Sequence, residues 1–237
     1  MSGNRTTAVL FDLDGTLLDT PGAIVSVVNK VLAESVRPVP PRERVRATVG
    51  RPLAAAFAEL LELEQEHCEV ARAVDRFRKL FREDVVPRAR SLIFPGVPEL
   101  LVRLRAEGLA LAIVTSKIRV SALELLEPAG LTHHFDAVVC HGMAPQGKPH
   151  PDPALFAARE LGREPGACVV VGDAVDDVRM AGAAGMRALG VTYGVATAEQ
   201  LTSAGAESVA ESVRALSEAL DGLRSSTVIT DRIRADT

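Results

Sequence analysis

The 237-residue sequence has no long apolar run, no excess of basic charge and no signal-peptide pattern. Each of these absences argues against one class of protein. No apolar stretch approaches the roughly 20 residues that an α-helix needs to cross a bilayer. The formal net charge of −4 has the wrong sign for electrostatic binding of nucleic acid. Residues 1–5 contain no apolar segment of the kind that begins a signal peptide. We therefore expect a cytoplasmic protein, a monomer or homodimer, that acts without a membrane or nucleic acid partner.

Cysteine is also scarce, and its spacing excludes two kinds of site. Cys68, Cys140 and Cys168 are odd in number and far apart, and no CxxC pair occurs. A disulfide framework and a zinc site are therefore not indicated. Cys168 is expected to be a small core residue in a strand.

Two carboxylates, Asp12 and Asp14, stand one residue apart directly after an apolar run at residues 7–11. In a strand, residues i and i+2 point the same way and lie roughly 6.6 Å apart, so we expect both acids to face one pocket. Two like charges this close need a cation or a shared proton. Gly15 then allows a turn and is expected to expose its N–H to an anion. An acidic turn without catalytic function remains an alternative, because Asp and Gly are common in turns.

Other apolar runs end in polar residues in the same way. Residues 109–114 are followed by Thr115, and residues 167–171 by Gly172 and Asp173. Short, continuous apolar runs that alternate with helical segments predict a parallel α/β sheet. Such sheets bind ligands outside the carboxyl ends of their strands. We therefore expect Asp12, Asp14, Thr115 and Asp173 to converge.

The alternation of elements resumes after residue 95, and a helical segment precedes it. Predicted strands cover 109–114, 135–140, 167–172 and 187–192, and predicted helices lie near 97–107, 119–129, 151–162 and 176–185. Before them, apolar residues recur at helical spacing in three segments: residues 22–35, the set Leu53, Phe57, Leu60 and Leu61, and the set Val70, Val74, Phe77 and Phe81. We expect a helical cap at 21–90, inserted into a core formed by 1–20 and 91–237. Residues 224–237 are polar and are expected to form a poorly ordered tail.

Four motifs resemble those of the haloacid dehalogenase superfamily, in their usual order. They are the run DLDGTLLDT that contains Asp12 and Asp14, the pair Thr115-Ser116, the loop Lys148-Pro149, and the segment Gly172-Asp173 with Asp177. The resemblance covers about residues 7–210. The sequences around Pro95, Thr115 and Lys148 are most similar to the phosphoglycolate-phosphatase-like branch. This resemblance implies a Rossmann-like core with helices on both faces of a parallel sheet and an inserted α-helical cap. Ala174 departs from many relatives, which carry Ser or Thr there.

The resemblance implies a phosphatase mechanism and assigns the four acids. Asp12 would be the nucleophile that forms an aspartyl-phosphate, and Asp14 would be the general acid and base. Asp12 and Asp173, with the backbone carbonyl of Asp14, form an oxygen-rich set that suits Mg²⁺. Asp177 would hold a metal-bound water.

Further residues complete this predicted site. Thr115 and the N–H of Ser116 would bind the phosphoryl oxygens, and Lys148 would supply a positive charge to nucleophile and phosphate. Only Lys30, Lys79, Lys117 and Lys148 are lysines, which favours a specific function for Lys148. Lys117, directly after Ser116, could have a function in the site or could equally be a solvated residue at the start of a helix. Arg51 occupies the loop where related caps reach over the substrate, although an exposed surface arginine is equally compatible.

We therefore predict a Mg²⁺-dependent phosphatase of a small-molecule phosphate ester. Candidate substrates are phosphoglycolate, a sugar phosphate or a C-nucleoside 5′-monophosphate of a natural-product pathway. A phosphomutase of the β-phosphoglucomutase type would share the nucleophile and the acid. A non-catalytic binding or regulatory protein on the same fold is the alternative outside enzymes, but such proteins usually lose a motif acid.

Overall fold

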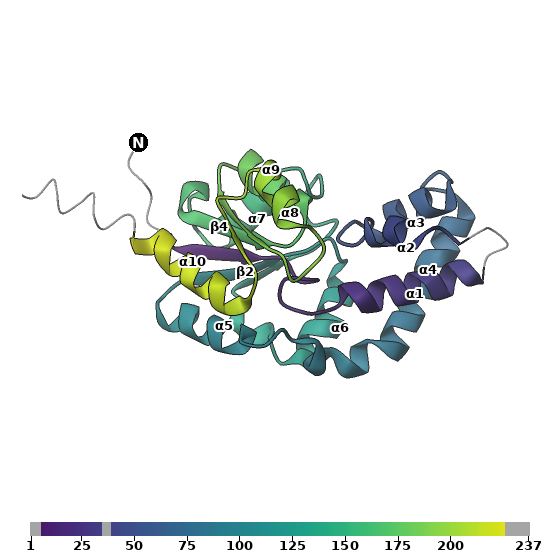
Figure 1. Ribbon diagram of the computed structural model, residues 1–237, viewed down its shortest axis with the longest axis horizontal. Helices are drawn as coiled ribbons and strands as arrows, with labels where there is room; N and C mark the ends of the chain where they lie inside the picture. The colour runs from purple at the N-terminus through teal and green to yellow at the C-terminus, as the bar shows by residue number, and fades with distance from the viewer. Residues whose placement is uncertain (1–5, 35–38, 226–237) are drawn as a thin grey trace, which may run out of the picture.

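A computed structural model describes residues 6–34 and 39–225 and shows a parallel sheet beside a group of helices (Figure 1). The six strands lie in the order β3-β2-β1-β4-β5-β6, and every pair is parallel. The strands are β1 (Ala8–Phe11), β2 (Ala110–Val114), β3 (Ala137–Val139), β4 (Cys168–Gly172), β5 (Arg187–Val191) and β6 (Ser208–Ala210). The predicted fold class is confirmed.

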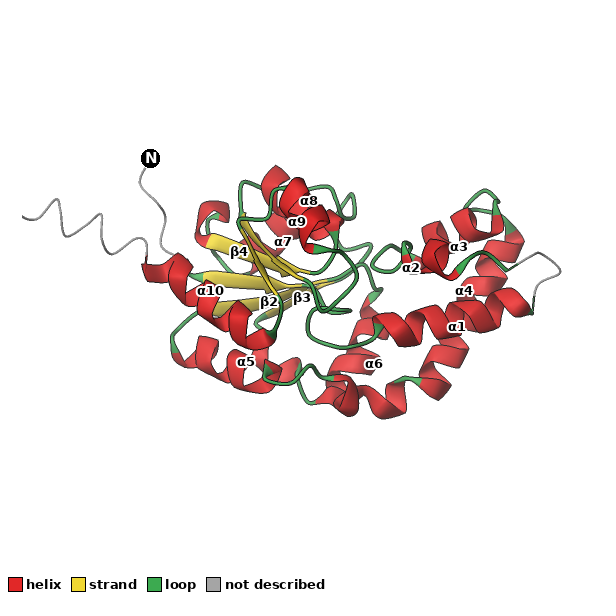
Figure 2. Cartoon of the chain, in the orientation of Figure 1, coloured by secondary structure: helices red, strands yellow, loops and turns green. Residues whose placement is uncertain are grey.

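Side chains of the central strand β1 alternate between two cores, one on each face of the sheet. Val9 and Phe11 belong to one buried cluster, whereas Ala8 and Leu10 belong to the other. All four are completely buried, which explains why the strand is a continuous apolar run in the sequence. Figure 2 shows helices on both faces. One face is covered by α5 (Val97–Ala106), α6 (Arg119–Ala129) and α10 (Val213–Ser225), the other by α7 (Asp152–Glu160), α8 (Val175–Ala183) and α9 (Ala198–Ala204).

The helices that follow β1 lie to one side of the sheet (Figure 1). They are α1 (Pro21–Ala33), α2 (Arg42–Arg46), α3 (Leu53–Leu61), α4 (Cys68–Asp84) and the 3₁₀ helix η1 (Val86–Leu92). Helix α4 contacts both α1 and α3. Phe77 of α4 packs edge-on against Phe57 and is stacked on Phe81, with ring centroids 6.1 and 5.4 Å apart. The helical spacing in the sequence therefore identified the buried face of α4, while the division of the chain at residues 21 and 90 stays a prediction.

The predicted strands and helices are present, with ends that differ by a few residues, but the last part of the chain was underpredicted. Strand β6 is only three residues long and begins at an exposed serine, so it has no apolar run to reveal it. Helices α9 and α10 were also not predicted. Arg224 and Ser225 end α10 rather than beginning a tail, and residues 226–237 lie outside the described residues.

Within 6–34 and 39–225, no helix is both long enough and apolar enough to cross a membrane. All three cysteines are free, and Cys168 is buried in β4 as expected.

Candidate active site

The sheet order brings three polar chain segments together at one edge. Strand β1 lies between β2 and β4, and Phe11 is level with Ile113 and Val171 of these neighbours. The residues just beyond these positions therefore leave the sheet side by side. They include Asp12 after β1, Thr115 after β2 and Asp173 after β4. The predicted convergence follows directly from this register.

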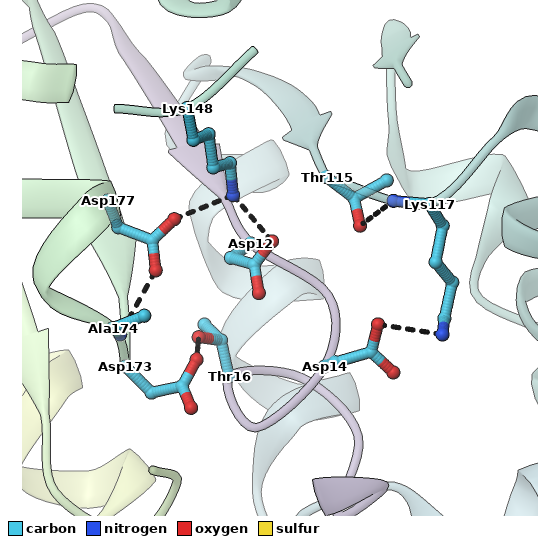
Figure 3. Close-up of polar contacts among 9 residues, drawn as sticks. All are labelled: Asp12, Asp14, Thr16, Thr115, Lys117, Lys148, Asp173, Ala174 and Asp177. Carbon is cyan, nitrogen blue, oxygen red and sulfur yellow. Dashed lines mark hydrogen bonds and ion pairs between the residues drawn. The ribbon is translucent and has the colours of Figure 1, made fainter. Parts of the chain in front are cut away.

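A buried lysine joins two of the acids. Lys148 Nζ lies 2.6 Å from Asp12 Oδ1 and 2.6 Å from Asp177 Oδ1 (Figure 3). The Lys148 side chain is only 5% exposed. Burial alone would lower the pKa of Lys148, but the charges of Asp12 and Asp177 raise it above its ordinary value, so the ammonium stays charged. Asp177 Oδ2 also accepts a hydrogen bond from the backbone N–H of Ala174 at the start of α8.

Asp173 lies in a tight backbone cradle beside this pair. Its carboxylate accepts hydrogen bonds from Thr16 Oγ1 at 3.0 Å and from the N–H of Val195 at 2.9 Å. A Cβ added to Gly15 or Gly194 would lie 2.1 or 2.2 Å from Asp173 Oδ2. Both glycines are therefore needed so that the backbone can approach the carboxylate.

The N–H of Gly15 does not have the function that the sequence predicted for it. Its N–H donates a hydrogen bond to the carbonyl of Leu18 at 2.8 Å, so this N–H is not directed at an anion. Its φ of +82° and its contact with Asp173 explain the glycine instead.

The carboxylates of Asp12, Asp173 and Asp177 form a group that could hold a metal ion. One oxygen of each lies within 4.8 Å of the others, and all three residues are buried. Burial and the neighbouring carboxylates raise the pKa of Asp12 and of Asp173, although Lys148 opposes this at Asp12. Three buried carboxylates beside one ammonium leave an excess of negative charge. An oxygen-rich group with this excess fits a hard divalent cation.

Asp14 has different partners from Asp12 (Figure 3). Its carboxylate accepts a hydrogen bond from Thr20 Oγ1 and lies 3.0 Å from Lys117 Nζ. The Lys117 ammonium also lies 4.8 Å from the ring centroid of Phe81 in α4. Asp14 therefore contacts a lysine that in turn contacts the helical segment.

A cavity of about 260 Å³ opens next to both acids. Asp12, Asp14, Thr115 and Ser116 all line it, so the expectation that the two acids face one pocket is met. Arg51 lies at the same cavity and forms an ion pair with Glu59 of α3. The first two sequence motifs thus line this cavity together with the helices after β1.

Sequence reasoning missed several contacts of this site. Thr16 and Thr20 belong to the first motif but were given no function, and Lys117 was left open between two interpretations. Tyr193 is the chain's single tyrosine, and its hydroxyl donates a hydrogen bond to the carbonyl of Thr16. The scarcity of lysine and tyrosine was the available signal for Lys117 and Tyr193.

Comparison with known proteins shows what this chain is similar to. The haloacid dehalogenase-like hydrolase family matches residues 9–191. The chain is 45% identical to a probable phosphatase IndB of Dickeya dadantii over 196 residues, 83% of this chain and 85% of the relative. It is 36% identical to a phosphoglycolate phosphatase of Cupriavidus necator, with 89% and 91% of the chains covered. The crystal structure of a hydrolase from Pseudomonas syringae is similar with a TM-score of 0.80 and 27% identity, over 92% of this chain and 99% of the other.

Proposed function

Because the chain belongs to the haloacid dehalogenase-like hydrolase family, we propose that it hydrolyses a small-molecule phosphate monoester through an aspartyl-phosphate on Asp12. The family and the phosphatase relatives bear out the resemblance inferred from the four motifs. The observation that carries the mechanism is the arrangement of the two acids. Asp12 is held by Lys148, whereas Asp14 stands apart from that pair and lines the same cavity.

Asp12 has the surroundings of a nucleophile. Lys148 contacts Oδ1 of Asp12, which orients the carboxylate and leaves Oδ2 to attack phosphorus. The P–O bond to the alcohol breaks as the Asp12–phosphorus bond forms. Lys148, Thr115 and the N–H of Ser116 would stabilise the charge on the phosphoryl oxygens, and the three residues line one pocket.

Asp14 would transfer the protons. In the first step it would protonate the departing alkoxide, and in the second it would take a proton from the water that attacks the aspartyl-phosphate. Thr20 and Lys117 fix the orientation of its carboxylate. Since neither contact involves Asp12, the proton-transfer group can keep its position while the nucleophile is phosphorylated.

The cluster of buried carboxylates formed by Asp12, Asp173 and Asp177 is suited to Mg²⁺. Asp12, Asp173 and the backbone carbonyl of Asp14 would hold the ion, and Asp177 would act through a bound water. The ion supplies electrostatic stabilisation of the phosphoryl charge when it is bound.

Removal of divalent metal is expected to abolish phosphate release. Mg²⁺ should restore activity, whereas Ca²⁺ should substitute poorly because its larger and looser coordination misplaces the reacting groups. The measurement is phosphate release after chelation and after titration with each ion. Asp173→Ala should raise the Mg²⁺ concentration for half-maximal activity by at least about tenfold. Full activity in thoroughly metal-free buffer would contradict this part of the proposal.

Turnover in ¹⁸O-labelled water tests the proposed reaction. A phosphatase incorporates one labelled oxygen into each inorganic phosphate that it releases, because water attacks the aspartyl-phosphate. The assay should use several phosphate esters and should quantify free phosphate and phosphorylated products by mass spectrometry. A phosphorylated isomer formed with little free phosphate would establish a phosphomutase instead. Absence of both products from all esters would support a non-catalytic protein.

A further inference from the structure

Beyond the phosphoryl-transfer residues, the cavity continues into a chamber with mainly apolar walls. Helices α1 and α4 and the segment that leads into α3 supply these walls, and their lining side chains are Ile24, Val28, Val49, Leu53, Phe77 and Phe81. The alcohol part of a phosphate ester whose phosphorus lies at Asp12 would extend into this chamber. Its walls therefore decide which alcohol is accepted.

Most of the charged side chains around the chamber already have partners in the protein. Arg51 is ion-paired with Glu59, Lys117 with Asp14, and Glu124 with Arg82 at 2.8 Å. A substrate group that contacts one of these three side chains would have to compete with its protein partner.

Arg78 of α4 is the exception among the cavity's charged groups. Its side chain lines the cavity and is 34% exposed, and its buried Nε has no hydrogen-bond partner among residues 6–34 and 39–225. Within the part of the chain that the structure describes, its guanidinium pairs only with the exposed carboxylate of Asp75, at 3.7 Å, which is longer than a hydrogen bond. Because this contact is long, a ligand in the cavity that supplies an acceptor to the guanidinium gains a charge-assisted hydrogen bond there.

The size of the cavity also favours a larger alcohol. Its volume of about 260 Å³ is several times the roughly 30 Å³ that a water molecule occupies in the liquid. A two-carbon acid has the bulk of only a few water molecules and would leave most of the apolar wall in contact with water.

On the basis of the proposed function, we infer that the preferred substrate is a phosphate monoester whose alcohol carries an apolar-faced ring with one hydrogen-bond acceptor. The ring lies against the apolar wall, and the acceptor receives a hydrogen bond from the Arg78 guanidinium. Arg78 is then a specificity residue, and 2-phosphoglycolate is a poor substrate.

Three esters test this inference in the wild-type protein with Mg²⁺. They are 2-phosphoglycolate, 2-phenylethyl phosphate, which has a ring but no acceptor, and 2-(4-acetylphenyl)ethyl phosphate, which adds a carbonyl acceptor. We expect kcat/KM to rise by at least about tenfold at each step of this series. An equal or higher kcat/KM for 2-phosphoglycolate than for the phenylethyl ester would overturn the inference and leave the phosphatase proposal intact.

Variants then locate the acceptor contact. Arg78→Met keeps an apolar stem but removes the donors, so it should abolish the advantage of the acetyl ester and leave the phenylethyl ester unchanged. Arg72→Met, on an exposed position of the same helix, is the matched control and should change neither. Equal losses on both ring esters in Arg78→Met would show that Arg78 acts on helix stability and would overturn its assignment.

A binding measurement separates failure of this inference from failure of the proposed function. If no ester, including p-nitrophenyl phosphate, is hydrolysed, the proposed function fails. Calorimetric titration of the Asp12→Asn variant with the same three esters still ranks their affinities. The acetyl ester should bind most tightly, and a reversed order would overturn the inference independently of turnover.

Discussion

Replacing Asp12 by Asn is expected to lower kcat for phosphate release by a factor on the order of 10⁴ or more, because the amide cannot form the aspartyl-phosphate. The substitution is nearly isosteric. Burial and nearby carboxylates raise the pKa of Asp12, so its charged form is unfavourable in the fold and a neutral amide should not weaken it. The free energy of unfolding, measured without metal, should therefore fall by no more than about 1 kcal/mol.

Asp19→Asn is the matched control for this result. Asp19 lies in the same motif, but it is exposed, whereas Asp12 is 6% exposed. The control should keep wild-type activity. Wild-type turnover in freshly purified Asp12→Asn would contradict the assignment of the nucleophile, and activity that grows on storage would indicate deamidation back to aspartate.

Among the substitutions proposed for this protein, Lys148→Met should lower the free energy of unfolding the most. It should also lower the activity. The side chain is 5% exposed and contacts two buried carboxylates at 2.6 Å, so its removal leaves Asp12 and Asp177 without this ammonium. Breaking a buried ion pair from one side costs about 3–5 kcal/mol. Loss of a positioned charge next to the phosphoryl group should lower kcat by about 10²–10³.

The pH dependence of this loss is part of the prediction. The pKa values of Asp12 and Asp173 are already raised by burial, and removal of the ammonium raises that of Asp12 further. A group with a raised folded-state pKa is favourable to folding at low pH and becomes unfavourable as pH rises through that value. The stability deficit of Lys148→Met should therefore grow from pH 5 to pH 8, and Mg²⁺ should reduce it.

Urea unfolding at both pH values, with and without Mg²⁺, measures this effect. Lys79→Met is the control, because Lys79 is an exposed lysine of α4. A similar deficit in both variants, or a deficit that shrinks at high pH, would show that charge compensation by Lys148 is not the cause.

The sheet and the placement of its motif acids could be predicted from local sequence patterns. Strands β1, β2 and β4 are buried on both faces, so each is a continuous apolar run whose polar follower marks the strand end. This is why Asp12, Thr115 and Asp173 could be placed together before their contacts were known. Strand β6 has no such run, and its existence depends on pairing with β5.

Contacts between distant residues could not be predicted in this way. Lys148 is 136 residues from Asp12, and its charge beside the nucleophile was expected only from the family resemblance. The fold adds that the same ammonium also contacts Asp177. Lys117 was equally compatible with a solvated helix start, and the structure instead pairs it with Asp14. Gly15 was expected to present its N–H to an anion, but the closed turn directs that N–H to Leu18.

The sequence by itself determined the alternation of strands and helices as far as β5, the acids at the strand ends and the family, because periodicity and motif spacing are properties of neighbouring residues. The tertiary structure decided which charge pairs with which, that Arg78 rather than Arg51 has a buried donor without a partner among the described residues, and that the cavity wall is apolar. These properties depend on distances between segments that the sheet and the helices after β1 bring together. Substrate preference arises from such distances, which is why the motifs alone left several phosphate esters equally compatible.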